Sequence, residues 1–547
     1  MNPIAAPKTL RYEPDAGLPV AIEAKSNRRY FYPSNGDKFG PKATNVIRMT
    51  LNANSFLDFS HSYLQFTVQN TNPDANGDGH IALDQGVPFF NRLQIMSGGQ
   101  ELEDIQEYSR LYSILQSVQG SRVTADESSL TQHKPFAGTF ADPNSDLATS
   151  VSAGGTDAAD RRLVAGGQAL AGDNNVTGAS VYTAITELEA AQTAAVNIAV
   201  DAAVNNAINN NTGEGASYKH TQTDTGVGRL TQANGGDGGK LTYNVPIISA
   251  FFNIDKYFPL LLTEQGLDLY FYLEQPLNIG VHAARDATAN YEITDVRYVA
   301  HEVNLDDAFV NQMKASMQAT GGVLSLSSTT YRYNNITGAQ DLRAGGQENL
   351  NISCRVKSLK GMLVRPQASC LNNSASRFCI STGQSVGITD AQFRIGSVLY
   401  PQSAIKFSNT NKGELFNEVR KCFGTIGSYA HGSSMNSATI RAMDQRDTRD
   451  TVVGEGTLQQ NWLLAYDFET FAKSATESGI NVADRALPVS LEITRAALEN
   501  TAGLAFVGAA STNAAAFDPV QTIRYDCFAM CDCIIYIDLM GKITTRI

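Results

Sequence analysis

The sequence predicts an all-β protein made of two tandem sandwiches with short flanking helices. Three observations lead to this prediction: the composition of the chain, a strand-turn-helix unit that occurs twice, and a long polar insertion in the first half. At 547 residues and 58.8 kDa the chain is too long for one ordinary hydrophobic core. With 45 Gly, 17 Pro and 18% charged residues, its composition favours strands joined by loops.

The first strand-turn-helix unit covers residues 90–120. Leu93 and Ile95 alternate with polar residues, which is typical of a strand with one buried face, and Gly98–Gly99 interrupt this pattern. We expect a helix to follow, with Glu103–Asp104 near its positive end, until Gly120 stops it. Its apolar positions recur at a spacing of three and four, at Ile105, Tyr108, Leu111, Tyr112, Leu115 and Val118.

A second unit of the same kind occurs some 300 residues later. Ala391, Phe393 and Ile395 alternate with polar residues, and Gly396 breaks the strand. A helix is expected from Asn411, because Asn411 followed by Glu414 resembles a capping box. Its apolar positions are Leu415, Phe416, Val419, Cys422 and Phe423. The chain is therefore predicted to contain two copies of one fold.

Each copy is followed by a strand with strict alternation, at 266–274 and at 487–494. The distance from Leu93 to Leu267 is 174 positions, whereas that from Phe393 to Leu487 is 94. The first copy thus carries an insertion, which we place at about 141–240, where Ala, Gly, Asn, Asp and Thr dominate. One helix is expected within it, because Val196, Val200, Val204 and Ile208 fall four apart.

These patterns divide the chain into an N-terminal arm at 1–40, a first sandwich at 41–320 and a second sandwich at 321–547. A linker helix is expected at 306–319, with Phe309, Val310, Met313 and Met317 inward. The last strand is expected to be the clearest in the chain and roughly 55 Å long, with a bulge left open, because every odd position from Ile523 to Leu539 is apolar or nearly so. Further strands are expected at 45–51, 63–69, 241–245, 291–303, 323–332, 352–364, 378–381 and 461–468.

Composition also restricts the partners of this chain. A net charge of −12 argues against direct, specific nucleic-acid binding, which needs clustered Lys and Arg. The sequence has no apolar run long enough for a membrane helix and no signal-peptide core, so we expect the protein to remain in the cytosol or nucleus. All seven Cys lie in the second half and are expected to be reduced thiols.

Two motifs could indicate chemistry. Residues 383–387 match the G-x-S-x-G nucleophile elbow, but a strand is predicted after the serine where that motif needs a helix, so we interpret them as a turn. Asp74, Asn76 and Asp78 have the spacing of a calcium loop. Gln85 stands where that loop needs a bidentate Glu, so a polar turn is favoured over a metal site.

The remaining candidates are single side chains or rows of them. Cys527, Cys531 and Cys533 share one strand face and are interpreted as buried thiols rather than metal ligands, because a strand cannot arrange them as a tetrahedron. The histidines form no metal-binding motif and are interpreted as structural: His61, His80, His133, His220, His282 and His301. No catalytic residues and no cofactor are therefore predicted.

Two tandem sandwiches, each with a helix after the fourth or fifth strand and the first enlarged by an insertion, resemble a known family. These are the double jelly-roll major capsid proteins of the adenovirus and tectivirus lineage. The chain looks most like those of small eukaryotic double-stranded DNA viruses, the polinton-like viruses and virophages. The likeness lies in Phe90–Leu115, in the strand Gly266–Glu274 after an aromatic segment, and in the repetition of both.

This resemblance implies two eight-stranded jelly rolls per chain and a homotrimer of near-hexagonal outline that tiles an icosahedral shell. Implied partners are other copies of the chain, penton and minor capsid proteins, while an internal membrane beneath the shell is left open. The implied location is the virion, with assembly in the host cytoplasm or nucleus. The alternative function is that of a tandem jelly-roll carbohydrate-binding protein or peptide glycosidase, for which Trp462 would be the candidate contact.

Overall fold

A computed structural model of the chain describes most of the predicted strands. The residues described are 24–71, 80–82, 89–119, 131–132, 229–231, 240–254, 256–281, 290–319, 321–341, 344–368, 380, 383–408, 410–424, 435, 440, 462–470, 478–483, 487–497 and 520–547. The candidate calcium ligands Asp74, Asn76 and Asp78 lie outside this part of the chain, and so does nearly all of the insertion at 141–240, including its expected helix.

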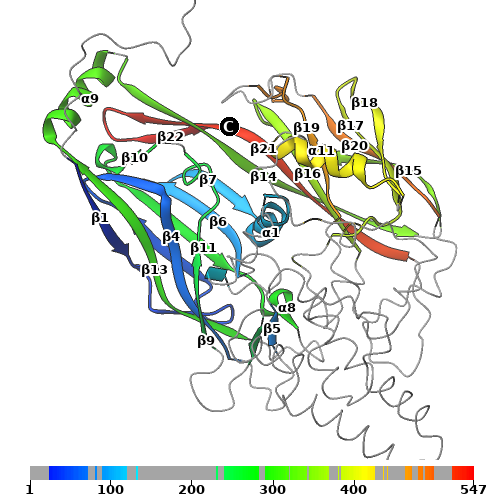
Figure 1. Ribbon diagram of the computed structural model, residues 1–547, viewed down its shortest axis with the longest axis horizontal. Helices are drawn as coiled ribbons and strands as arrows, with labels where there is room; N and C mark the ends of the chain where they lie inside the picture. Colours follow the sequence, from blue (N-terminus) through cyan, green and yellow to red (C-terminus); the bar gives the residue numbers. More distant parts are fainter. Residues whose placement is uncertain are drawn as a thin grey trace, which may run out of the picture.

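The first half of the chain forms two facing antiparallel sheets (Figure 1). One sheet has the order β1 (Ala24–Phe31), β13 (Tyr291–Leu305), β4 (Phe56–Asn70) and β10 (Phe258–Pro259). In the same sheet, β2 (Lys38–Phe39) pairs with β13, and β9 (Lys240–Val245) pairs with β4. The other has the order β3-β11-β6-β7: Val46–Leu51, Leu267–Leu273, Phe90–Ser97 and Gln100–Gln106. A small third sheet contains β12, β5 and β8: Gly280–Val281, His80–Ala82 and Arg229–Thr231. Short helices α1, η3 and α8 cover Tyr108–Gln119, Leu260–Leu262 and Pro276–Ile279.

The second half forms another pair of sheets. Its larger sheet has the order β14 (Val323–Asp341), β21 (Val520–Asp538), β16 (Leu359–Ala368) and β19 (Leu464–Asp467), and β22 (Ile543–Arg546) pairs with β21. Its smaller sheet has the order β15-β20-β17-β18: Gly346–Ile352, Val489–Arg495, Ile388–Ile395 and Val398–Lys406. Helix α11, Gly413–Phe423, lies after β18, and helix α9, Asp307–Ala319, connects the two halves.

The two halves repeat one topology, as the sequence predicted. The path β1-β13-β4-β10 corresponds to β14-β21-β16-β19, and β3-β11-β6-β7 corresponds to β15-β20-β17-β18. In each half the helix follows the fifth strand of the eight. This arrangement of two four-strand paths, with each strand pairing antiparallel to its neighbours, is that of a jelly roll.

The alternating strands were predicted correctly. Along β11 every second residue is buried, and the partly exposed residues between them face outward. Strand β21 is one continuous strand that pairs with β14 from Val520 to Asp538 without a register shift. Helix α9 begins one residue after its predicted start; Met317 is buried, Val310 and Met313 are half-buried, and the side chain of Phe309 is not described.

The first predicted helix begins too early in the sequence analysis. Gly98 and Gly99, with φ of 57° and 78°, form a two-residue turn, so the next residues return along β6 as strand β7. Glu103 therefore lies in a strand and not at a helix terminus. Helix α1 begins only at Tyr108, where the carbonyl of Glu107 accepts the N–H groups of Arg110 and Leu111. The spacing of Ile105 and Tyr108 fits a helix, but Ile105 pairs with β6 and belongs to a strand.

The second unit contains the same error and one more. Strand β18 follows the turn at Gly396 and was not predicted. Helix α11 begins at Gly413, and the capping box at Asn411 is not formed. Glu414 Oε1 instead accepts the backbone N–H of Lys406, and the Asn411 amide donates to Glu414 Oε2 at 3.2 Å. The side chains thus tie the helix to β18 and do not cap its first turn.

A third difference concerns the strand expected at 352–364. The structure divides it into the end of β15 and the start of β16, which belong to different sheets. Cys354 and Val356 are buried between them, so the apolar alternation continues while the backbone crosses the sandwich. Burial alternation alone does not show where a chain changes sheets.

The two jelly rolls share one continuous hydrophobic core. Strands β14, β21 and β22 extend beyond the second jelly roll and lie over the first, towards α9 (Figure 1). Phe66, Phe90 and Tyr243 fill the first jelly roll, and Phe393 with Phe468 fills the second. None of the helices in the described residues is both long and apolar enough to cross a membrane.

Candidate functional site

The serine of the G-x-S-x-G motif lies in a turn, as interpreted from the sequence. Ser385 is fully buried, and its carbonyl accepts the N–H of Ile388 at 2.8 Å. Val386 and Gly387 have φ of 42° and 79°, and strand β17 follows directly. A nucleophile elbow needs a helix at this point and an exposed hydroxyl. The motif therefore provides no nucleophile.

The three cysteines of β21 are buried thiols, as predicted. Cys527, Cys531 and Cys533 are fully buried, and burial raises the pKa of each thiol, to about 12 for Cys533. Such thiols stay protonated and are poor metal ligands. Within the described residues, no group of three or more His, Cys, Asp or Glu side chains is placed to hold a metal ion. Asp74, Asn76 and Asp78 lie outside those residues.

Trp462 is not available as a sugar-stacking surface. Its side chain is 1% exposed and packs edge-on against Phe407, with ring centroids 5.7 Å apart. The backbone N–H of Trp462 donates to the carbonyl of Gly383. The residue thus belongs to the core of the second jelly roll.

The sequence analysis missed a buried polar cluster between the two halves. It consists of Glu107 and Arg110 from the start of α1, and of Tyr333, Gln367, Arg524 and Asp526 from β14, β16 and β21; we call it the junction network. Arg110 is 4% exposed, and its Nη1 lies 3.1 Å from Asp526 Oδ2 and 3.0 Å from Gln367 Oε1. These partners are more than 250 residues away in sequence, so no local pattern could reveal them.

The charges of the junction network balance each other. Arg524 bridges Asp526 at 2.7 Å and Glu107 at 2.9 Å, and Tyr333 donates to Asp526 at 2.7 Å. Burial alone would raise the pKa of Asp526, but Arg110 and Arg524 lower it overall. Asp526 is therefore a carboxylate with charged partners from both jelly rolls, which fixes their relative orientation.

A second polar contact crosses the same junction. Glu103 of β7 is buried and accepts the hydroxyl of Thr330 from β14 at 2.5 Å, together with the N–H of Ala250 at 3.0 Å. Burial raises the pKa of Glu103. Glu103 was expected, together with Asp104, near the end of a helix. It lies instead in a strand and connects the two halves of the chain.

The end of the chain adds a third connection. The Thr545 hydroxyl on β22 donates to the carbonyl of Leu102 at 2.8 Å, and Gly541 accepts the N–H of Glu264 at 3.1 Å. Gly541 has φ of 76°, and a Cβ there would lie 2.6 Å from the Glu264 nitrogen. The β21–β22 turn can approach the first jelly roll this closely because it has a glycine.

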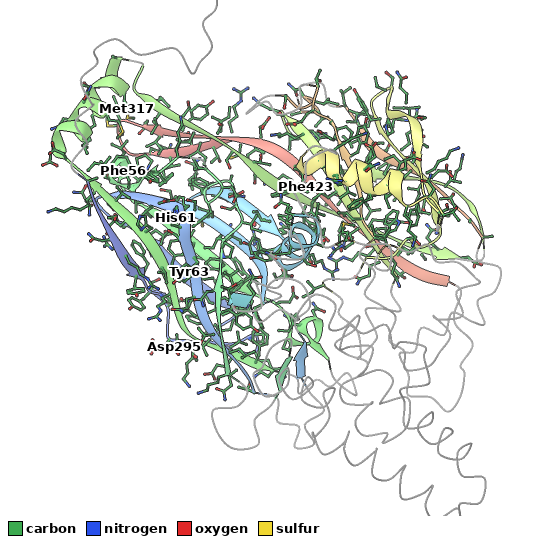
Figure 2. The ribbon with its side chains drawn as sticks, viewed as in Figure 1. Phe56, His61, Tyr63, Asp295, Met317 and Phe423 are labelled. Carbon is green, nitrogen blue, oxygen red and sulfur yellow. The ribbon has the colours of Figure 1, made fainter. Side chains whose placement is uncertain are left out.

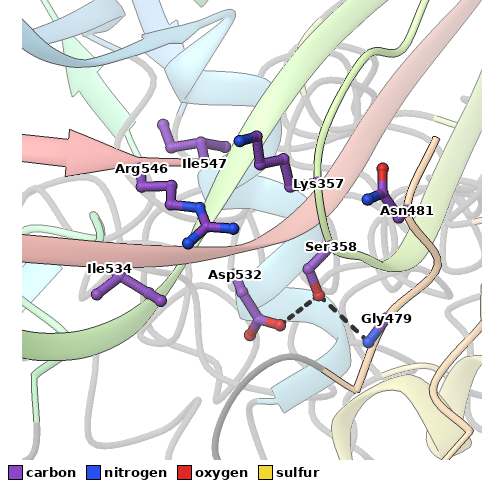
Figure 3. A pocket seen from close by; sticks show the side chains of 8 residues that line it. All are labelled: Lys357, Ser358, Gly479, Asn481, Asp532, Ile534, Arg546 and Ile547. Carbon is purple, nitrogen blue, oxygen red and sulfur yellow. Dashed lines mark hydrogen bonds between the residues drawn. The ribbon is translucent and has the colours of Figure 1, made fainter. Parts of the chain in front are cut away.

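The pocket shown in Figure 3 is shallow, with a volume of about 250 Å³ between β21, β22 and the segment 478–483. Ser358 donates to Asp532 at 2.5 Å and accepts the Gly479 N–H at 3.2 Å. Lys360 lies 3.0 Å from Glu469 and 3.5 Å from Asp532. These bonds satisfy side chains that join strands to a loop, and they form no catalytic arrangement.

Arginines stack on tyrosines over both outer faces of the first jelly roll; we call these the tyrosine–arginine faces. On the β1-β13-β4 sheet they are Arg28, Arg297, Tyr30 and Tyr63, and on the β3-β11-β6 sheet they are Arg48, Arg92, Tyr270 and Tyr272. The guanidinium carbon lies 5.2–5.8 Å from the ring centroid in these pairs. Tyr and Arg are among the residues that are enriched at protein–protein contacts.

No family model and no curated protein sequence matches this chain. Among solved structures, PBCV-1 VP54, fitted into a cryo-EM reconstruction of the virophage Sputnik, matches with a TM-score of 0.50 and 10% identity, covering 97% of this chain and 99% of that one. The chain has a double jelly-roll fold. This double jelly-roll chain also matches the mavirus major capsid protein with a TM-score of 0.46 and 10% identity, covering 100% of this chain and 95% of that one.

Proposed function

We propose that this double jelly-roll chain is the major capsid protein of an icosahedral double-stranded DNA virus, with a structural role and no catalytic one. The observation that carries the proposal is the fold: two complete jelly rolls in one chain, shared with VP54 over almost the full length of both chains. VP54 is itself a protein that has been fitted into a virus particle. The chain would be located in the virion, after assembly in the host cytoplasm or nucleus.

The duplicated fold supports assembly as a homotrimer. Three chains around a three-fold axis would present six jelly rolls, and six similar units around one axis give a near-hexagonal outline that can tile a shell. Such tiling needs a fixed angle between the two jelly rolls of each chain. The junction network, Glu103 and the β21–β22 turn provide three separate contacts that hold this angle.

The surfaces of the first jelly roll suit contacts between copies. The tyrosine–arginine faces offer stacked side chains that lose little conformational freedom when a partner covers them. We place these faces against neighbouring chains, within one trimer or between adjacent trimers. The insertion at 141–240 and the loop near 433–457 would project from one end of the jelly rolls.

The proposed division of the chain follows the sheets. We place the boundary between the two jelly rolls at about residue 320, after α9, and the division of the strands before and after α9 into separate sheets supports this. Strand β1 pairs with β13 along its full length, so the part of the arm free to reach neighbours would be the residues before Ala24. Its partners would be neighbouring trimers, penton and minor capsid proteins, or a membrane beneath the shell.

Light scattering of the purified protein, followed by electron microscopy of the same fraction, tests the proposal. We expect a species of three times 58.8 kDa with a hexagonal outline. A stable monomer would contradict the proposal. Removing the residues before Ala24 should leave soluble trimers that do not form shells; normal shells from this variant would overturn the role of the arm.

The alternative of a sugar-active protein lacks its expected features. The side chain proposed as its platform, Trp462, is buried, and Ser385 is buried as well. Glycan binding by the purified chain at the β17 end of the second jelly roll would be the result in its favour.

A further inference from the structure

A pair of histidines lies side by side on the outer face of the β1-β13-β4 sheet, and neither has a role in the assembly proposal. His61 is on β4 and His301 on β13, with ring centroids 5.9 Å apart and planes inclined by 53°. The His61 side chain is 73% exposed, and Figure 2 shows it beside Tyr63 on β4. No local pattern could indicate this pair, because the two residues are 240 positions apart.

A β-bulge brings His61 to this position. Tyr63 is the partner of Val299, and Asp58 is the partner of His301, so four residues of β4 lie opposite the single residue Ala300. The Ser62 hydroxyl accepts the His301 N–H at 2.9 Å and donates to the Asp58 carbonyl, which closes the bulge. Bulges of this kind redirect a side chain out of the regular alternation.

A buried carboxylate fixes the orientation of the His61 ring. Asp58 is 4% exposed, and its Oδ2 lies 2.6 Å from His61 Nδ1. The other oxygen, Oδ1, accepts the backbone N–H of Ser60 at 3.0 Å and its hydroxyl at 2.6 Å. Because the short contact with Asp58 engages Nδ1, Nε2 is the ring nitrogen of His61 that remains for a ligand.

We infer that His61 and His301 together bind one divalent transition-metal ion of the Zn²⁺ or Cu²⁺ type, with Asp58 as the residue that orients His61. A carboxylate on the second ring nitrogen is the usual support of a metal-binding histidine. With metal–nitrogen bonds of about 2.1 Å and ring nitrogens about 1.1 Å from the ring centre, two imidazoles on one ion have centroids about 5.2 Å apart at a tetrahedral angle, and up to about 6.4 Å apart when they face each other across the ion. The observed separation of 5.9 Å lies within this limit.

The remaining coordination positions would be filled by water, because the site has two protein ligands. Arg28, the partner of His301 on β1, brings a positive charge that opposes cation binding. Its guanidinium is held by the Tyr63 hydroxyl at 2.6 Å and by the Tyr30 ring. Glu302 is directed to Ser55 and Arg29.

Calorimetric titration with Zn²⁺ and electron paramagnetic resonance with Cu²⁺ test this site on the full chain at neutral pH. His61→Ala and His301→Ala should each remove the same one equivalent of bound ion, and the double variant should remove no more than either alone. The Cu²⁺ spectrum of the unchanged chain should show nitrogen coupling that both single variants lose. Asp58→Asn should weaken binding by about 10–100-fold without removing the site.

Thr67→Val is the matched control, because Thr67 lies on the same strand, its hydroxyl contacts Thr242 and not Arg28, and both imidazoles stay in place. It should bind the ion as the unchanged chain does. The shared site does not exist if the two histidine variants bind as many ions as the unchanged chain. It does not exist either if each single variant loses its own ion and the double variant loses both. Circular dichroism of each variant checks that the fold is retained. Light scattering on the same samples follows trimer formation separately, so a loss of metal binding is distinguished from a loss of assembly.

Discussion

The junction network makes a quantitative prediction about the stability of the fold. Arg110→Met removes a 4% exposed guanidinium that contacts Asp526, Glu107 and Gln367. The cluster then carries one net negative charge without compensation. Removing one partner of a buried ion pair costs about 3–5 kcal/mol. Because Asp526 keeps Arg524 and Tyr333, we expect the lower end, about 3 kcal/mol.

Urea unfolding followed by fluorescence measures this loss. The denaturant dependence of a 547-residue chain exceeds the roughly 1–3 kcal/mol per molar of small proteins, so the unfolding midpoint should fall by somewhat less than about 1 M. The matched control is Arg48→Met, whose 47% exposed side chain lies 3.5 Å from Asp268. An exposed pair of this kind contributes about 0.2–1 kcal/mol.

A combined variant separates the ion pair from packing. Replacing both charges, in Arg110→Met with Asp526→Leu, should recover part of the stability that Arg110→Met loses, because no buried charge is then left without its partner. If Arg110→Met destabilises the chain no more than Arg48→Met, the two jelly rolls are not held by this network and the reasoning fails.

Three further predictions concern the other buried groups. Gly541→Ala should destabilise the chain more than Gly99→Ala in thermal unfolding, because both have φ near 77° but a Cβ at Gly541 would meet Glu264 while none is within 4 Å at Gly99; equal losses would contradict the close approach. Burial raises the pKa of Glu103 above its unfolded value of about 4.3, so protonated Glu103 stabilises the fold at low pH, and this stabilisation is lost as pH rises through the folded pKa. The free energy of unfolding of Glu103→Gln should not show this decrease with pH, and identical pH dependence in both proteins would refute the prediction. Iodoacetamide at about pH 8 should leave Cys533, with its raised pKa of about 12, unmodified until urea is added, and peptide mass spectrometry that finds rapid modification of the folded chain would exclude its burial.

The repeated topology was predictable because alternation is a local property. Leu267–Leu273 and Val489–Arg495 alternate between buried and outward residues in the sequence as they do in the sheets. The start of the helix was misplaced because Ile105, Tyr108 and Leu111 have helical spacing, while the pairing of β7 with β6 depends on a two-glycine turn. Secondary structure near a tight turn therefore depends on pairing that spacing does not reveal.

The contacts between the jelly rolls could not be predicted from sequence. Arg110 reads as one polar position on a helix, and Asp526 reads as an interruption between Tyr525 and Cys527 on a strand. Their burial follows from the approach of two sheets whose residues are 416 positions apart. A charged residue within an apolar strand, such as Asp526, was the one available signal that a partner comes from elsewhere.

The ribbon of β14, β21 and β22 also has a consequence for biosynthesis. The strands of the first jelly roll end at Leu305, but Leu102, Glu103 and Arg110 receive partners from β21, β14 and β22, which extend to Arg546. At about 5–20 residues per second, roughly 10–50 s of translation separate these two points. During that interval the ribosome carries a first half whose junction surface is uncovered, so the protein acquires its final shape late in synthesis.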